Sequence, residues 1–400
     1  MKPSRNTQNS LLIIFFAVTA VIIIICYRNF NPGKKDSVTE PTSYDIAFLS
    51  NTPQISASES NFQAYHGVSG ISEELGKNFN TYFVSSDNGM IQPTAVIPEN
   101  NSANMQKEPV YKNDDSAPTG RSEYTEMIRQ AVNDGARLII CPDPSYEETL
   151  YAVQKDYINT YFILVDGIPH NPDDSDRTIN YNVIPISYNE AEIGFLAGYA
   201  LVYEGYDSLA FIGDSRTSGV IRYGYGFLQG ANYAAEECNV DNVEIRYCYA
   251  EDTEEAEVAA QKYFFSGIPV ITAAGDELIQ PLLGIASRYD SYVVSCGNYY
   301  DLYEESDRFL ALSYKDIAVS VADTVKNFYT NDVSGGKMIT AGTQGNWIGF
   351  DYDSEKFSRF TPDVYNTVYR QLAEDKILLI SDTTVSVEDL GLTHITIKNE

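Results

Sequence analysis

The sequence predicts an α/β protein with two parallel-sheet lobes. Along most of the chain, short apolar runs of about four to eight residues alternate with amphipathic helical patterns. Strands that alternate with helices form parallel sheets that carry helices on both faces. A length of 400 residues is too great for one small core and suits two domains of common size.

The first half of the body is expected to begin with a strand at residues 44–50. The strands after it are expected at 81–86, 136–142 and 161–167, and the helices at 62–75, 125–135 and 147–156. Residues 87–120 are rich in Asn, Pro, Asp and Ser and have no periodicity, so we interpret them as a long insertion.

The second half repeats this alternation. Strands are expected in SLAFIGD, NVEIRYCYA, IPVITAAG and DSYVVSCGN, each preceded by a helical pattern. Two strands end in polar turns, at Asp166-Gly167 and at Gly213-Asp214. These turns place polar groups at the carboxyl ends of parallel strands, which is the edge where open α/β sheets bind ligands.

The charge of the chain excludes several partners. The formal net charge is −29 and the pI is about 4.3, whereas binding to nucleic acid requires a basic surface. The electrostatic field of this negative charge also disfavours a dianionic ligand. A neutral or cationic small solute is therefore expected.

The N-terminus has the pattern of a signal peptide or signal-anchor. Lys2 and Arg5 precede the apolar run at residues 11–26, and a polar linker follows at 29–43. A buried core helix is the alternative. Cys26 would allow a lipoprotein, but a lipobox has a small residue where this chain has Ile25. We expect an uncleaved anchor at the plasma membrane with the body outside the cell.

The cysteines and histidines predict no metal site and no cofactor. The five cysteines form no CxxC pair, and the chain has only three histidines. Cys238 and Cys248 flank a helix-to-strand turn, where a disulfide remains open from the sequence. No GxSxG, P-loop, HExxH or GxGxxG motif stands in a suitable context, so we do not expect an enzyme.

The stretch from Tyr161 to Ala235 resembles one family of binding proteins. It contains a strand ending in Asp-Gly, an Asn-Val crossover, the helix FLAGYA, the strand SLAFIGD and the helix motif GFLQG, in this order. The chain resembles the basic membrane protein family, the purine-nucleoside-receptor type of substrate-binding lipoprotein of ABC transporters. The resemblance covers roughly residues 44–350.

This resemblance implies a type I periplasmic-binding fold whose chain crosses the hinge three times. The crossings are expected near 170–184, 312–315 and 339–343. Lobe 1 would then comprise 44–170 and 315–338, lobe 2 would comprise 183–312 and 340–365, and 366–400 would be a divergent C-terminal extension.

The function implied is extracellular capture of a small neutral solute, most simply a nucleoside, for an ABC permease in the membrane. The alternative is an extracellular ligand-sensing regulatory protein with the same fold and no transport role. The sequence patterns predict no output domain after the binding region, which favours the transport role.

In the first lobe the resemblance selects three ligand-binding candidates. Asn51 stands where the family has an aspartate, and Asn61 keeps the family's amide position. Phe62 is displaced by two positions from the family's stacking ring. It is either the platform for a base or a packing residue of its own helix.

In the second lobe, Tyr223 falls on the family's stacking phenylalanine and Phe227 on the packing one. Asp214 follows a strand at the ligand-binding edge, with an N-cap or turn carboxylate as the alternative. Gly275 and Asp166 lie at strand ends, where backbone contacts to a ligand are expected.

Two further candidates complete the set. Gly297 or Asn298 replaces the family's ribose-binding aspartate, and an amide accepts more weakly than a carboxylate. Lys315 matches a hinge lysine that would bind a sugar hydroxyl, with an ion pair to Asp316 or Asp166 as the alternative. The lost carboxylates weaken the case for strict purine-nucleoside specificity.

Overall fold

The computed structural model describes residues 43–52, 55, 60–84, 120–275, 277–297 and 306–398. The expected anchor with Cys26, nearly all of the linker, and the insertion up to residue 119 lie outside these residues, as does Asn298. Within the described part of the chain, no helix is both long and apolar enough to cross a membrane.

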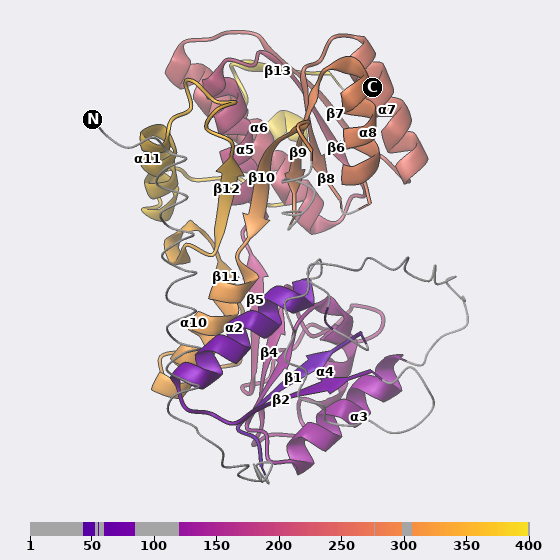
Figure 1. Cartoon of the computed structure of the whole chain (residues 1–400), viewed down its shortest axis with the longest axis vertical. Helices are drawn as coiled ribbons and strands as arrows, with labels where there is room; N and C mark the ends of the chain where they lie inside the picture. The colour runs from indigo at the N-terminus through magenta and orange to yellow at the C-terminus, as the bar shows by residue number, and fades with distance from the viewer. Residues whose placement is uncertain are drawn as a thin grey trace, which may run out of the picture. The chain divides into compact units, whose positions relative to one another are not determined.

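The first sheet is entirely parallel and has the strand order β11-β5-β4-β3-β1-β2 (Figure 1). Its strands are β1 (Ile46–Ser50), β2 (Phe79–Phe83), β3 (Leu138–Cys141), β4 (Tyr161–Val165), β5 (Val183–Tyr188) and β11 (Ile339–Ala341). The central strands are buried on both faces, which explains why they are continuous apolar runs.

Helices cover both faces of this sheet. Helices α2 (Ser60–Glu74) and α10 (Ile317–Thr330) pack on the face that carries Ile46 and Phe48. Helices α3 (Gly120–Asn133) and α4 (Glu147–Val153) pack on the opposite face, with Ala47 and Leu49. The alternation of faces along β1 is the period of two that a strand requires.

The second sheet has the order β12-β10-β9-β8-β6-β7-β13. Its strands are β6 (Ser208–Gly213), β7 (Val243–Tyr249), β8 (Val270–Ala274), β9 (Tyr292–Cys296), β10 (Phe309–Lys315), β12 (Ile348–Tyr352) and β13 (Ile395–Lys398). Among the described residues of this sheet, only β12 pairs antiparallel with its neighbour, β10. The predicted α/β class with mostly parallel sheets is confirmed.

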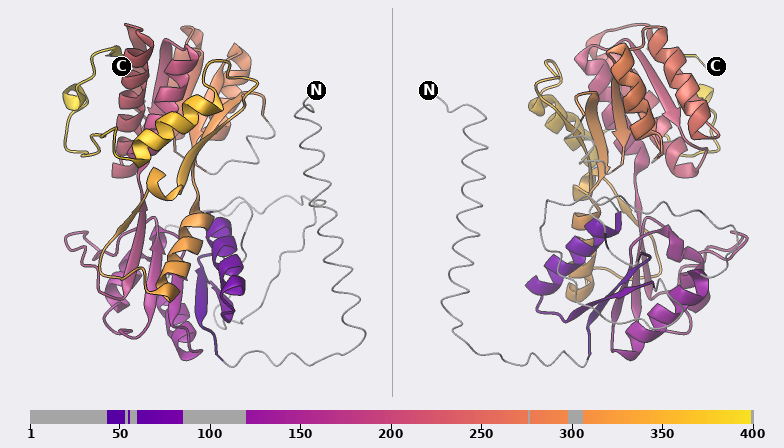
Figure 2. Two further views of the ribbon diagram at one scale, coloured as in Figure 1. Left: turned by 90° about the vertical axis from the view of Figure 1, so that its left-hand side faces the viewer. Right: turned by 45° about the vertical axis from the view of Figure 1, so that its right-hand side comes forward.

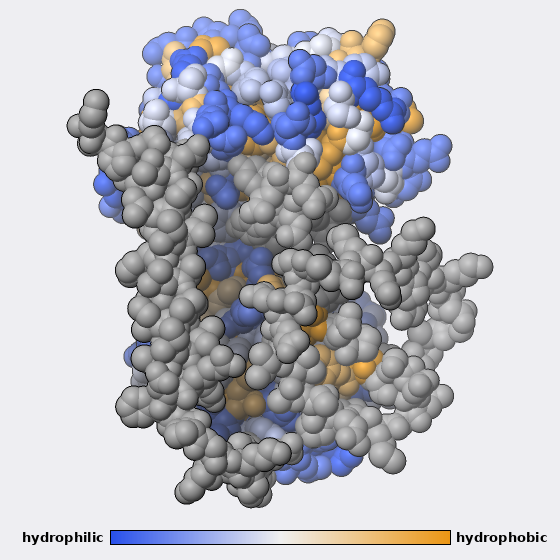
Figure 3. Space-filling model, in the orientation of Figure 1, coloured by the Kyte–Doolittle hydropathy of each residue, from blue (hydrophilic) through white to orange (hydrophobic). Residues whose placement is uncertain are grey.

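Four helices cover the second sheet. Helices α5 (Glu190–Glu204) and α6 (Ser218–Cys238) pack on one face, and α7 (Thr253–Phe265) and α8 (Ile279–Tyr289) on the other (Figure 2). The surface of this lobe that faces the viewer in Figure 3 is mostly hydrophilic, as the large net charge suggests.

The C-terminal extension is part of the second lobe. After α11 (Pro362–Ala373), the chain runs along α6, where Gln229 exchanges hydrogen bonds of 2.9 Å with the backbone N–H and C=O of Ile380. It ends in β13, which pairs parallel with β7 and forms the edge of the sheet. The alternating sequence ITIK indicates a strand, but our sequence reading did not assign one there.

The chain passes between the two sheets three times. Strand β5 belongs to the first sheet and α5 packs on the second, so the first passage lies between Tyr188 and Glu190. The expected position, 170–184, is too early because β5 still pairs with β4. The second passage follows Lys315, and the third lies between β11 and β12, both close to the expected positions.

Four glycines allow α5 and α6 to touch along their backbones. They form two matching Gly-x-x-x-Gly pairs, Gly194 with Gly198 and Gly226 with Gly230. A Cβ atom on any of them would overlap a backbone carbonyl of the other helix. Only glycine permits this spacing, and α5 is consequently buried over most of its length.

This contact gives the first prediction. Gly226→Ala should lower the free energy of unfolding by about 1–3 kcal/mol, because the added methyl group must push the helices apart. Gly70→Ala is the control, since nothing lies within 4 Å of a Cβ there. It should be neutral or stabilise α2 by up to about 1 kcal/mol. Urea unfolding of both variants measures the difference, and equal effects would contradict the proposed packing constraint.

Candidate ligand-binding site

An ion pair joins the carboxyl ends of two strands that belong to different sheets. Asp166 follows β4 in the first sheet, and Lys315 ends β10 in the second. The Nζ atom of Lys315 lies 2.8 Å from Oδ2 of Asp166. The ligand-binding edges of the two sheets therefore face each other at this point.

Glu190 and Arg222 extend this ion pair into a cluster of four charges. The carboxylate of Glu190, only 8% exposed, lies 3.5 Å from Nζ of Lys315. It also accepts a hydrogen bond of 2.9 Å from Nε of Arg222 on α6. We call Asp166, Lys315, Glu190 and Arg222 the hinge quartet. Its two acids and two bases have no net charge.

Burial and pairing act in opposite directions on the hinge quartet. Burial alone would lower the pKa of Lys315, but the charges of Asp166 and Glu190 outweigh it and raise the pKa. Lys315 therefore remains charged at neutral pH, and its stabilising contribution is lost only as pH rises through this raised pKa. The pKa of Asp166 is raised as well, because burial and the charge of Glu190 together outweigh the lowering effect of Lys315 and Arg222.

The structure thus contains one of the ion pairs that the sequence left open for Lys315, the pair with Asp166. Asp316 has a different role, because its carboxylate accepts from the N–H of Val319 at 3.0 Å and caps α10. Glu190 and Arg222 were not among the predicted site residues. A glutamate at the first position of a predicted helix suggests only a favourable helix terminus.

A chain of amides lies at the corresponding edge of the first sheet. Nδ2 of Asn61, whose side chain is buried, donates to Oδ1 of Asn51. Nδ2 of Asn51 in turn donates to Oδ2 of Asp143 at 2.6 Å. Oδ1 of Asp143 accepts from the N–H of Ser145 at 2.8 Å. Two predicted residues, Asn51 and Asn61, are brought together here, and Asp143 was missed.

Asp143 follows β3 in the sequence Cys-Pro-Asp-Pro-Ser. Burial raises its pKa, and hydrogen bonds from Ser145 and Asn51 oppose this rise. An aspartate two residues before a serine is a helix-capping signal, and it does cap the short 3₁₀ helix Pro144–Tyr146. The capping signal in the sequence does not indicate the hydrogen bond between Asp143 and Asn51.

Phe62 lies beside the amide chain in sequence but packs differently. Its half-buried ring meets His66 edge to face, with ring centroids 4.3 Å apart. Its role as a platform for a base remains a prediction.

Tyr223 is a core residue in this structure, contrary to the expectation of a ring available to a ligand. Its side chain is 1% exposed, its ring stacks on Phe211, and its hydroxyl shares a hydrogen bond of 3.1 Å with Ser313 Oγ. The close contact of α5 and α6 places Gly194 over its backbone carbonyl. Phe227, expected in the core, is fully buried.

Asp214 and Gly275 meet at the edge of the second sheet. A Cβ on Gly275, whose φ is +151°, would overlap the side chain of Asp214. The N-cap of α6 is Thr217, not Asp214. Asp214 Oδ1 instead accepts from Ser215 Oγ at 2.9 Å. Asn298 lies outside the described residues.

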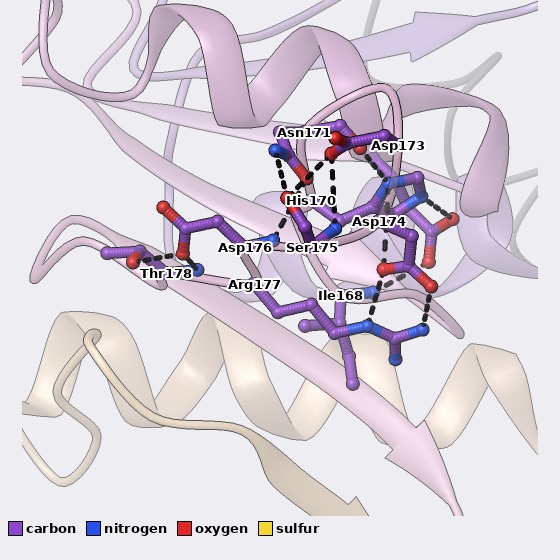
Figure 4. A network of polar contacts seen from close by, with 10 residues as sticks. Ile168, His170, Asn171, Asp173, Asp174, Ser175, Asp176, Arg177 and Thr178 are labelled. Atoms are coloured by element: carbon purple, nitrogen blue, oxygen red, sulfur yellow. Dashed lines mark hydrogen bonds and ion pairs between the residues drawn. The ribbon is translucent and has the colours of Figure 1, made fainter.

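A pocket of about 310 Å³ lies in the first lobe. Its lining residues are Tyr124, Pro144, Ser145, Glu147, Glu148, Thr149 and His170. Glu147 accepts from the N–H of Ile168 at 2.8 Å, and its other oxygen lies 3.2 Å from Nε2 of His170. Figure 4 shows Ile168, His170 and the acidic loop that follows them. Both carboxylate oxygens serve the loop, so we assign the contact a structural role.

The described cysteines carry no cross-link. Cys141, Cys238, Cys248 and Cys296 form no disulfide, so Cys238 and Cys248 are not bridged.

The fold and the opposed sheet edges define a two-lobed solute-binding protein. The family model of PnrA-like substrate-binding proteins of ABC transporters (Bmp) matches residues 55–384. The chain belongs to this family, whose members bind substrates for transporters and are not enzymes. The resemblance found in the sequence is confirmed.

Solved structures show the same fold at low sequence identity. A solute-binding protein of an ABC transporter system from Conexibacter woesei is 13% identical, with a TM-score of 0.58 over 85% of this chain and 99% of that one. A counterpart from Aeropyrum pernix is 15% identical, with a TM-score of 0.52 over 86% and 89%. A transcriptional activator of the comK gene from Bacillus halodurans is 14% identical, with a TM-score of 0.57 over 82% and 96%. No curated protein matches significantly.

The hinge quartet gives the second prediction. Glu190→Gln should lower the free energy of unfolding by about 3 kcal/mol, because it leaves two partly buried cations without their shared, buried carboxylate. Glu126→Gln is the control, since the Glu126–Arg129 pair is half exposed and should contribute nothing measurable. Urea unfolding at neutral pH tests both. A Glu190→Gln variant as stable as the parent would refute the coupling.

Proposed function

We propose that the chain is the extracellular solute-binding protein of an ABC importer and binds a neutral, nucleoside-like solute between the two sheet edges. The ion pair between Asp166 and Lys315 is the observation that carries this proposal, because it sets the carboxyl ends of both sheets against each other. The family membership supports the transport role.

The charges at the site favour a neutral solute. Lys315 and Arg222 are both paired with carboxylates inside the hinge quartet. Neither offers an unpaired charge to a phosphate, and the net charge of −29 opposes an anion. Amide and carboxylate groups suit the hydroxyls and ring nitrogens of a nucleoside. We propose Asn51, Asn61, Asp214 and Asn298 for these contacts.

The remaining contacts have separate roles. Phe62 is proposed to stack on the base, since it is the partly exposed ring next to Asn61. The backbone at Asp166 and Gly275 borders the solute. Lys315 would donate to a solute hydroxyl while it keeps its bond to Asp166. Tyr223 is left out of the proposed contacts because of its burial.

A regulatory role is the alternative that one observation favours. The transcriptional activator from Bacillus halodurans shares the fold, so the fold by itself also serves regulation. Both roles require a solute site, and they differ in whether a permease is engaged. Uptake of the bound solute by cells with and without the gene distinguishes them.

A thermal-shift screen with nucleosides, bases and sugars provides the third prediction. Nucleosides should raise the melting temperature, because a solute at 100 times its Kd stabilises the native state by about 2.7 kcal/mol. Asn61→Leu should abolish most of this shift. Lys326→Met, which changes an exposed pair with Glu74, is the control and should respond like the parent. Stabilisation by sugars alone would refute the nucleoside assignment.

The tether proposed for residues 11–26 provides the fourth prediction. An apolar run that follows a short basic tail should hold the acidic body outside the cell. Protease added to intact protoplasts should therefore remove residues 43–400 from the membrane fraction. The control is a cytoplasmic protein of the same cells, which should remain intact. Protection of the body in sealed protoplasts would contradict the tether.

A further inference from the structure

The amide chain at the edge of the first sheet has only one possible direction. The N–H of Ser145 can only donate, so the carboxylate of Asp143 accepts from it and also accepts from its other neighbour, Asn51. Asn51 must therefore turn its Nδ2 toward Asp143 and its Oδ1 toward Asn61. Asn61 must in turn donate through its Nδ2. The backbone of one serine thus fixes the orientation of two side-chain amides.

The far end of this chain is an acceptor without a donor. Asn61 is 3% exposed, and its Oδ1 has no hydrogen-bond partner among the residues that the structure describes. A buried acceptor that lacks a donor is costly to the folded protein. Asn61 cannot relieve this by rotating its amide, because two oxygens would then face each other at Asn51.

The residue types along the chain are matched to one another. The family resemblance implies an aspartate at the position of Asn51. A carboxylate there would face the carboxylate of Asp143 across 2.6 Å, the present distance between Asn51 and Asp143. Two carboxylates this close cannot both be charged. The amide at Asn51 is therefore the residue type that Asp143 requires.

We propose that Asp143 is a specificity-determining residue: through Asn51 it holds Asn61 with Oδ1 presented, so that the site selects a solute with an N–H or O–H donor at this point. The proposal rests on the proposed function in one respect, that the solute binds at this edge. Asp143 acts through the two amides and is a positioning residue. An edge of a nucleobase that presents an acceptor here would be rejected, because two acceptors would meet.

A single isosteric substitution should reverse the direction of the hydrogen bonds along the amide chain of Asn51 and Asn61. In Asp143→Asn, the new amide must still accept from the N–H of Ser145, so its NH₂ group faces Asn51. Asn51 must then present its oxygen to that group and its NH₂ to Asn61. Asn61 must accept from Asn51 and presents its own NH₂ to the solute. The required solute group changes from a donor to an acceptor.

Adenosine and inosine are suitable probes because they carry donor and acceptor in opposite order on the same base edge. Adenosine has an amino group at position 6 and an acceptor at position 1, and inosine has the reverse. Whichever position meets Asn61, the parent protein should prefer one nucleoside. Calorimetric titration should show that Asp143→Asn reverses this preference, with the ratio of the two Kd values changing by at least about tenfold.

Asp173→Asn is the matched control. Asp173 accepts from the N–H of Ser175 two residues later, as Asp143 does from Ser145, but it lies in an exposed loop where its partners are Ser175 and Asn171. It should leave the preference unchanged. Equal preferences in the parent and in Asp143→Asn, with both nucleosides bound, would overturn the proposal.

A second measurement needs no solute and separates this proposal from the proposed function. In the parent protein labelled with ¹⁵N-asparagine, the side-chain amides of Asn51 and Asn61, assigned by their loss in Asn51→Ala and Asn61→Leu, should show hydrogen-bonded proton shifts. Asp143→Asn should move the Asn61 amide signal toward the unbonded range, and Asp173→Asn should not. If neither nucleoside binds, the nucleoside assignment fails, but a shifted Asn61 signal would still support the role of Asp143 in orienting the amide chain. An unmoved Asn61 signal would overturn that role.

Discussion

The backbone contact between α5 and α6 is the constraint on which the rest of the second lobe depends. Gly194, Gly198, Gly226 and Gly230 remove the side chains that would separate the helices. Because the helices touch, Arg222 of α6 reaches Glu190 at the start of α5, and the ring of Tyr223 is directed into the core toward Ser313. The same packing therefore supplies the hinge quartet with its second cation and withdraws a ring from the site.

The hinge quartet determines how charges are paired where the edges of the two sheets face each other. Glu190 stands where the chain enters the second lobe and Lys315 where it leaves, so one cluster of charges holds two of the three passages. Glu190 is buried and the other three charges are partly buried, and each has an opposite partner, which is the condition under which a protein tolerates such burial. Both cations of the quartet, Lys315 and Arg222, are paired with carboxylates. Under the proposed function, this pairing would disfavour an anionic solute at the hinge.

Sequence periodicity predicted the fold class and eight of the thirteen described strands, because fully buried strands must be apolar along their length. It did not assign β5, β10, β11, β12 or β13. It failed where pairing is long-range. Strand β13 is short and lies at an edge. The first passage, which the family resemblance placed near 170–184, lies later in the chain because β5 still pairs with β4. Glu190 and Asp143 were missed because each also has a local role, at a helix start and a helix cap. Their partners, Arg222 and Asn51, lie far away in the sequence, and single-sequence patterns contain no information on such contacts.

The two edges carry different kinds of recognition group. On the second-lobe side the charges of the hinge quartet neutralise one another. They therefore hold the strand ends in place more than they impose a hydrogen-bond direction. At the first-lobe side the amides of Asn51 and Asn61 are neutral, and their direction is imposed by Asp143 and the N–H of Ser145. A directed hydrogen-bond chain distinguishes a donor from an acceptor although it carries no net charge at its amide end. Under the proposed function and the proposed role of Asp143, the hinge quartet would act against charged solutes and the amides of the first lobe would select by hydrogen-bond polarity.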